Sequence, residues 1–249
     1  MGGYVTFGNG PKKVIALHGW FGDHTTFDAM RNALTPGAFT YALPAYRGYG
    51  LSKAITGEYS IREISADVIE IADKLGWPHF DLIGHSMGGM AVQRVLADAP
   101  ERVRKIVAIT PVPASGVPLP PDQELLFAGA ANSPEARHAI IDFSTSNRQS
   151  RSWIDHMVSH SFECSTTEAF AAYFQAWSKT NFVDAIIGNK VPMLVIVGAN
   201  DPSLNADMMK ATYLNWYPNA ILEVIENAGH YPMDETPVAL ATRIEKFLS

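Results

Sequence analysis

Ser86 lies in the segment Gly84-His85-Ser86-Met87-Gly88-Gly89, and the residues on either side of this segment indicate a catalytic role for the serine. The apolar run 80–83 before it predicts a buried strand, and the apolar spacing of residues 87–97 predicts a helix. A serine in G-x-S-x-G between a strand and a helix occupies a sharp turn that exposes its hydroxyl above the sheet. Glycines two residues to either side leave room for the crowded backbone. We therefore predict that Ser86 is a nucleophile; the alternative is a serine that only supports the start of a helix.

A serine hydroxyl needs a general base, and histidine suits this role because its unperturbed pKa lies near neutral pH. His230 is the strongest candidate, since it lies in a turn-rich loop between the last predicted strand and the last predicted helix. The base in turn needs a carboxylate to fix its tautomer. Asp201 fits this role because it follows the apolar run 193–197, whereas Asp207 is expected inside the next helix. The alternatives are a loop histidine bonded to backbone and a carboxylate of a surface loop.

Other histidines of the chain suit other roles. His85 lies inside the predicted turn and is expected to point away from the nucleophile. His18 ends a predicted strand and is expected to order the neighbouring loop. Three more are expected to be ordinary helix residues: His138, His156 and His160.

Acyl transfer also requires backbone N–H groups where negative charge develops on the substrate oxygen. The residue after the nucleophile supplies one donor, here Met87. The second is expected from the loop after an early strand, with Trp20 as first choice and Phe21 as second. Both rings would also line the acyl pocket, although the His18-Gly19 turn has the alternative of a plain strand-to-helix connection.

Strand-like and helix-like runs alternate along the chain, which predicts an α/β fold with a mostly parallel central sheet flanked by helices. The expected strands are residues 4–7, 14–17, 39–43, 80–83, 105–109, 193–197 and 221–225. The expected helices of the core are residues 25–34, 61–75, 87–97, 206–216 and 237–248.

Residues 111–189 break this rhythm, because the segment opens with several prolines and then shows only helical patterns. The helix-like stretches are 122–131, 134–143, 151–160 and 166–179. We predict an inserted helical cap, or lid, over a core formed by residues 1–110 and 190–249. Concave apolar sites gather at the carboxyl ends of parallel strands. The aromatic side chains expected to contact a substrate there are Phe21, Phe127, Trp153 and Trp177.

The order Ser86, Asp201, His230, together with the His18-Gly19 loop, resembles the α/β-hydrolase superfamily, in particular its compact, capped carboxylesterase-like members. The resemblance covers nearly the whole chain. It implies that Ser86 is the nucleophile, Asp201 the acid and His230 the base of a catalytic triad, with the amides of Trp20 and Met87 as the oxyanion hole. Residues 44–52 resemble the family's D-x-R-G-x-G-x-S loop, but Ala45 stands where the aspartate usually is.

The resemblance implies hydrolysis of an ester, lactone, thioester or amide, or of certain carbon–carbon bonds. The aromatic side chains of the expected cap favour a small to medium-sized apolar carboxylic ester, cleaved through an acyl-enzyme on Ser86. A lactonase or a carbon–carbon bond hydrolase would use the same three side chains. A small-molecule sensor built on this fold is the alternative from another class, and rapid turnover would distinguish an enzyme from it.

Composition sets limits on partners and compartment. The net charge of −6 and the lack of a dense basic patch argue against nucleic acid as a partner. No apolar run is long enough to span a membrane, so no membrane partner is expected. Cys164 is the single cysteine, which favours a reducing, cytoplasmic compartment. Neither a cofactor nor a metal is expected, because His and acidic residues do not cluster at ligand spacing along the sequence.

Overall fold

The computed structural model describes residues 2–249 and contains a seven-stranded sheet. Its strands are β1 (Tyr4–Gly8), β2 (Lys12–Leu17), β3 (Phe39–Pro44), β4 (Phe80–His85), β5 (Val103–Ile109), β6 (Met193–Gly198) and β7 (Ala220–Ile225). The order across the sheet is β1-β3-β2-β4-β5-β6-β7. Only β1 runs antiparallel to its neighbour, β3. The predicted α/β class with a mostly parallel sheet is therefore confirmed.

Burial along the strands explains why these segments form the middle of the sheet. Every residue of β4 and β6 is buried, as expected for parallel strands that are covered on both faces. The edge strands differ, since most residues of β1 and β7 retain some exposure. The fully buried strands β4 and β6 therefore lie inside the sheet, where neighbouring strands hold the residues that follow them.

Several α-helices flank this sheet, together with short 3₁₀ helices. They are α1 (Ile61–Lys74), α2 (Met87–Asp98), α7 (Ala206–Ala211), α8 (Tyr213–Trp216), α9 (Pro232–Glu235) and α10 (Pro237–Leu248), with short 3₁₀ helices η1 (Asp28–Ala33), η2 (Gly50–Ser52) and η3 (Val183–Ala185). Helix α1 packs against α2, and α10 packs against η1. None of the helices within residues 2–249 is long and apolar enough to cross a lipid bilayer.

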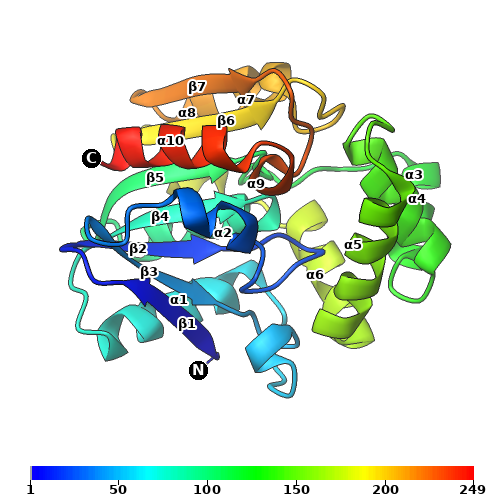
Figure 1. The fold of residues 1–249 in the computed structure, drawn as a ribbon, viewed down its shortest axis with the longest axis horizontal. Helices are drawn as coiled ribbons and strands as arrows, with labels where there is room; N and C mark the ends of the chain where they lie inside the picture. The colour runs from blue at the N-terminus through cyan, green and yellow to red at the C-terminus, as the bar shows by residue number, and fades with distance from the viewer. Residues whose placement is uncertain (1) are drawn as a thin grey trace.

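Four helices are inserted between β5 and β6. They are α3 (Pro121–Gly129), α4 (Pro134–Ser144), α5 (Arg151–Cys164) and α6 (Thr167–Lys179). Their starts follow from the sequence, because the side chains of Ser133, Ser150 and Thr166 each accept a hydrogen bond from the amide three residues later. These helices lie together beyond the carboxyl ends of the parallel strands (Figure 1).

A buried arginine joins these inserted helices. Arg137 of α4 is 1% exposed, and its guanidinium lies 3.6 Å from the ring centroids of both Phe162 and Phe170. It donates hydrogen bonds to the Ala130 carbonyl and the Ser161 hydroxyl. Burial lowers its pKa to about 10. One side chain thus ties α4 to α5, α6 and the end of α3.

Two expected core helices differ in the structure. The segment predicted as a helix over 25–34 forms the 3₁₀ helix η1, after successive i to i+3 bonds such as Thr26 N to Asp23 O and Asp28 N to Thr25 O. The segment predicted as one helix over 206–216 is split at Thr212, whose φ of −118° and ψ of −86° are not helical. Local turn geometry outweighed helical spacing in both places.

Candidate active site

Ser86 occupies the sharp turn between β4 and α2. Its φ of 54° and ψ of −117° are strained for a residue with a side chain. The turn is held by Ser86 N donating to Ile109 O and by Ser86 O accepting from the amide of Val112. A Cβ on Gly84 would lie 2.3 Å from Gly88 O, so the turn is closed around that glycine. The sequence interpretation of a crowded strand-to-helix turn is therefore correct.

The structure brings Ser86, His230 and Asp201 into one hydrogen-bonded series. Ser86 Oγ lies 3.0 Å from His230 Nε2, and His230 Nδ1 lies 2.7 Å from Asp201 Oδ2. The other oxygen of Asp201 accepts hydrogen bonds from the amides of Ser203 and Leu204. Because the carboxylate can only accept, Nδ1 of a neutral His230 carries the proton and Nε2 is free to accept one from the serine.

The sheet topology explains this convergence. Ser86 follows β4, Asp201 follows β6 and His230 follows β7, so all three side chains come from the carboxyl ends of parallel strands. These ends share one edge of the sheet, where sites of α/β proteins form. Asp207, the rival acid, lies in the first turn of α7, and its carboxylate pairs with Lys210 instead.

The two predicted donor amides flank the serine. Met87 is the first residue of α2, where an amide has no acceptor within its own helix. Trp20 lies in the loop after β2, and that loop approaches the serine closely: a Cβ on Gly19 would lie 3.2 Å from Ser86 Cβ. The indole of Trp20 is fixed by its own hydrogen bond to Phe170 O at 2.7 Å. The loop after β2 and the start of α2 therefore both lie next to Ser86.

An apolar cavity of about 620 Å³ reaches Ser86 and His230 from the inserted helices. Three of the four aromatic residues expected to contact a substrate line it: Phe21, Phe127 and Trp177. Trp153 is not among the lining residues; its ring instead packs edge-on against Tyr231, 5.6 Å between centroids. The cavity is large enough for an acyl chain of several carbons.

A second, smaller cavity of about 260 Å³ meets the first at Ser86 and is lined by polar groups. His156, His160 and Asp234 face it. Burial, and next the charge of Glu235, raise the pKa of Asp234 to about 6. This smaller cavity is not predictable from the sequence, because the direction of the α5 side chains and of the loop after His230 depends on tertiary packing.

Two more buried histidines support the site. His18 Nδ1 lies 2.8 Å from Gly19 O, and its Nε2 accepts from the amide of Tyr46, so it orders the loop as expected. His85 Nε2 lies 2.8 Å from the carbonyl of His230, behind the turn. Burial lowers the pKa of His18 to about 4 and that of His85 well below its usual value. Both rings are therefore neutral at physiological pH.

The end of α4 and the linker to α5 hold the loops that carry Asp201 and His230. The amide of His230 donates to Ser144 O, and the hydroxyl of Ser146 donates to Asn200 O. The carboxylate of Glu235 is 2% exposed and accepts from the amides of Gly229 and Tyr231. Its second oxygen accepts from Arg148 and Gln149 of the linker. These residues were not predicted as part of the site, because their types and spacing do not indicate such a contact.

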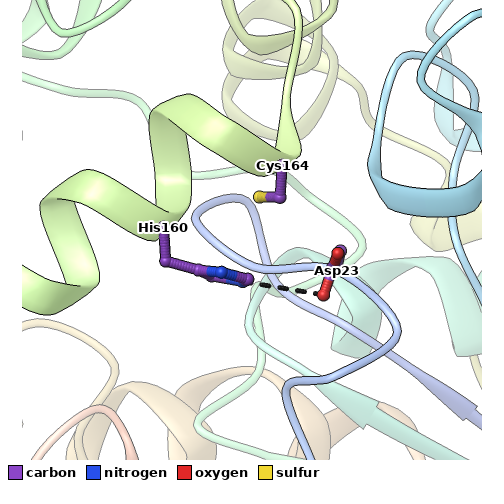
Figure 2. A group of neighbouring side chains, drawn as sticks. All are labelled: Asp23, His160 and Cys164. Atoms are coloured by element: carbon purple, nitrogen blue, oxygen red, sulfur yellow. Dashed lines mark ion pairs between the residues drawn. The ribbon is translucent and has the colours of Figure 1, made fainter.

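His160 is not the ordinary helix residue that the sequence predicts. It lies 3.6 Å from the carboxylate of Asp23, and Cys164 is one helical turn further along α5 (Figure 2). The contacts with Asp23 and then Cys164 raise the pKa of His160 to about 10. Burial acts to raise the pKa of Asp23, but hydrogen bonds from His160 and Thr25 outweigh it and hold that pKa well below its usual value.

Comparison with known proteins agrees with the fold. Residues 12–237 match the family model of the alpha/beta hydrolase fold, so the chain belongs to this family. It is 25% identical over 245 residues to the 3-oxoadipate enol-lactonase 2 of Acinetobacter baylyi, covering 97% of this chain and 91% of the relative. It is 28% identical over 219 residues to the 2-hydroxymuconate semialdehyde hydrolase of Pseudomonas putida, covering 83% of this chain and 75% of the relative. The esterase EaEST of Exiguobacterium antarcticum has the same fold, with a TM-score of 0.88 at 19% identity, covering 98% of this chain and 94% of that one.

Proposed function

We propose that this α/β hydrolase is a serine esterase that cleaves small to medium-sized apolar carboxylic esters through an acyl-enzyme on Ser86. The observation that carries the proposal is the series of two hydrogen bonds from Ser86 through His230 to Asp201, at 3.0 and 2.7 Å. A serine, a base and an orienting carboxylate at these distances form the arrangement of nucleophilic acyl transfer.

Acylation uses all three side chains of the proposed triad and both proposed donor amides. Ser86 Oγ bonds to the carbonyl carbon of the ester while His230 Nε2 takes the hydroxyl proton, and Asp201 stabilises the resulting imidazolium. The amides of Trp20 and Met87 donate to the oxygen that becomes negative. The tetrahedral intermediate then collapses, the bond to the alcohol oxygen breaks, and His230 gives its proton to the leaving alcohol.

Deacylation repeats these steps with water. His230 takes a proton from the water as its oxygen bonds to the acyl carbon, and then returns that proton to Ser86 Oγ as the carboxylic acid leaves. The reaction therefore consumes one water and needs no redox step.

The apolar cavity supports the substrate class. We assign the acyl chain to the cavity lined by Phe21, Phe127 and Trp177, because burial of apolar surface is its main source of binding energy. Residues 111–189, which contain the four inserted helices, form the cap of this site in our proposal, over a core of residues 1–110 and 190–249.

A lactone is the second candidate substrate, favoured by the similarity to an enol-lactonase along 97% of the chain. The same steps open a lactone, except that the alcohol stays attached to the acyl chain. A carbon–carbon bond hydrolase remains an alternative within the family, and a ligand sensor remains one outside enzymes.

Steady-state turnover of p-nitrophenyl esters from acetate to decanoate tests the proposal, beside Ser86→Ala and the matched control Ser152→Ala, at an exposed position of α5. We expect rapid turnover with an optimum chain length, lost in Ser86→Ala and kept in Ser152→Ala. Labelling by a fluorophosphonate probe, mapped by mass spectrometry, is expected on Ser86.

Other outcomes separate the alternatives. Turnover of lactones but not of esters would favour the second candidate, and cleavage of a vinylogous diketone alone would favour the carbon–carbon hydrolase. A stoichiometric burst without turnover would favour the sensor. A folded protein that neither turns over any of these compounds nor labels at Ser86 would contradict the proposal.

A further inference from the structure

A cluster of three metal-ligand side chains lies beside the site, outside the proposed triad. Asp23 follows β2, and His160 and Cys164 lie on α5 (Figure 2). One ligand atom of each residue lies within 4.8 Å of the other two. His160 and Cys164 are four residues apart, so their side chains leave the same face of the helix.

The spacing is close to that of a tetrahedral zinc site. Zinc bonds of roughly 2.0–2.3 Å to nitrogen, oxygen and sulfur place ligand atoms about 3.3–3.6 Å apart in a tetrahedron. Asp23 Oδ1 and His160 Nε2 are 3.6 Å apart. The remaining ligand atoms lie within 4.8 Å of one another, so they would have to approach by up to about 1.5 Å to reach tetrahedral spacing.

The electrostatics of the cluster favour a cation. The side chain of Asp23 is 7% exposed, and within residues 2–249 its ion-pair partners are only the histidines His24 and His160. The thiol of Cys164 is buried; it contacts His160, and its backbone contacts are long, at 4.0 Å to Phe21 O and 3.8 Å to Ser161 O. Neither backbone contact commits the sulfur, and the thiolate is the form that binds metals.

A further histidine lies beside Asp23 of the cluster. His24 Nδ1 is buried and has no hydrogen-bond partner among the described residues, yet it lies 3.4 Å from the second oxygen of Asp23. A buried ring nitrogen without a partner is costly unless something else occupies it. Access exists too, because His160 lines the smaller cavity and its side chain is 28% exposed.

We propose that Asp23, His160 and Cys164 bind one Zn²⁺ ion that links α5 to the loop after β2. Mixed nitrogen, oxygen and sulfur donors suit zinc, whereas magnesium and calcium prefer oxygen alone. The site is separate from Ser86, His230 and Asp201, and the proposal does not depend on the hydrolytic reaction.

Cobalt is the probe, because tetrahedral Co²⁺ absorbs in the visible and its thiolate complexes show a charge-transfer band in the near ultraviolet. The reduced chain, without a histidine tag, is titrated with Co²⁺. We expect both absorption features to saturate at one equivalent of Co²⁺, and one equivalent of Zn²⁺ to abolish them. Cys164→Ala is expected to lose the charge-transfer band, and His160→Gln and Asp23→Asn are expected to bind at least tenfold more weakly.

The matched control is His156→Gln, one turn earlier on α5, which is expected to bind as the wild type does. Circular dichroism of each variant checks folding, and three separate ligand variants guard against failure of any one. Absence of the charge-transfer band in the wild type, or equal affinity in wild type, Cys164→Ala and His160→Gln, would mean that Co²⁺ binds adventitiously and would overturn the proposal.

Discussion

At the scale of single residues, the two oxygens of Asp201 have different tasks. Oδ1 accepts from the amides of Ser203 and Leu204, while Oδ2 accepts from His230. The backbone bonds fix which oxygen faces the histidine. An amide at this position would therefore keep its oxygen toward the backbone and turn its NH₂ group toward the ring.

Asp201→Asn should consequently force the wrong tautomer on His230, because its NH₂ group donates to Nδ1 and leaves the proton on Nε2. We expect kcat to fall on the order of 10⁴-fold, with the fold intact. Steady-state kinetics on the best ester of the series measures this. Asp207→Asn, at an exposed carboxylate, is the control and should keep wild-type kcat. A fall of less than tenfold in Asp201→Asn would show that Asp201 does not set the tautomer.

The buried neutral ring of His18 predicts a dependence of stability on pH. Its folded pKa is about 4, below the usual 6.5, so the unfolded state binds more protons between these values. The stabilisation is complete above pH 6.5 and is lost as pH falls toward 4, by up to about 3 kcal/mol. Urea unfolding at several pH values from 7 to 4.5 measures the free energy of unfolding. As the pH falls, this free energy should decrease with a shallower slope in His18→Gln than in the wild type. His79→Gln, at an exposed histidine, should keep the wild-type slope.

Sequence reasoning reached some of these residues and not others, for a physical reason. Ser86, Asp201 and His230 each follow a predicted strand, so the topology alone brings them to one edge. His160 and Glu235 instead act through contacts between the inserted helices and the core. Such contacts depend on how helices rotate against their neighbours, and a single sequence does not encode that rotation in a readable period.

At the scale of elements, the contact between α2 and β2 depends on a glycine. A Cβ on Gly88 would lie 2.4 Å from Leu17 O and 2.7 Å from His18 O, and both are backbone atoms that cannot move aside easily. The start of α2 carries the serine turn, so a shift of this helix also displaces the nucleophile.

Gly88→Ala should therefore lower the free energy of unfolding by roughly 2–3 kcal/mol and also lower kcat. Gly129→Ala in α3 is the matched control, because a Cβ there meets nothing within 4 Å. That variant should be neutral or slightly stabilising. Urea denaturation of both variants checks the pair, and equal stability of the two would contradict the close approach of α2 to β2.

The elements themselves were largely predictable. All seven strands appear close to where apolar runs place them, since strands buried on both faces must be continuously apolar. The helices Pro237–Leu248 and Pro134–Ser144 were predictable as well, because each begins at a proline, a residue that favours the first position of a helix. The 3₁₀ helix Asp28–Ala33 was not predictable, because i to i+3 turn bonds compete there with a valid helical pattern. The non-helical backbone of Thr212 interrupts a helical pattern that gives no sign of it.

At the scale of the whole molecule, Glu235 connects the loop of His230 to the α4–α5 linker. Its four hydrogen bonds use both carboxylate oxygens, and all four partners donate. A glutamine at position 235 must direct its NH₂ group at one pair of these donors, and an NH₂ group cannot accept their hydrogen bonds. Glu235→Gln should therefore lower both kcat and the free energy of unfolding, the latter by about 2 kcal/mol.

Kinetics and urea unfolding of Glu235→Gln test this coupling, with the exposed Glu226→Gln as control. Arg148→Ala should reproduce part of the loss in kcat, because it removes one donor to Glu235 from the linker side. If Glu235→Gln changes stability but leaves kcat unaltered, the linker does not position the base.

The same linker has a consequence for recombination between relatives. A chimera that replaces residues 111–189 with another family member's segment would exchange the walls of the apolar cavity, but it would also remove Arg148, Gln149 and Ser146. The buried carboxylate of Glu235 would then keep only its two backbone donors, and the carbonyl of Asn200 would lose the Ser146 hydroxyl. Specificity and catalytic geometry are thus inherited together, and a graft that keeps residues 144–149 of the host would separate them.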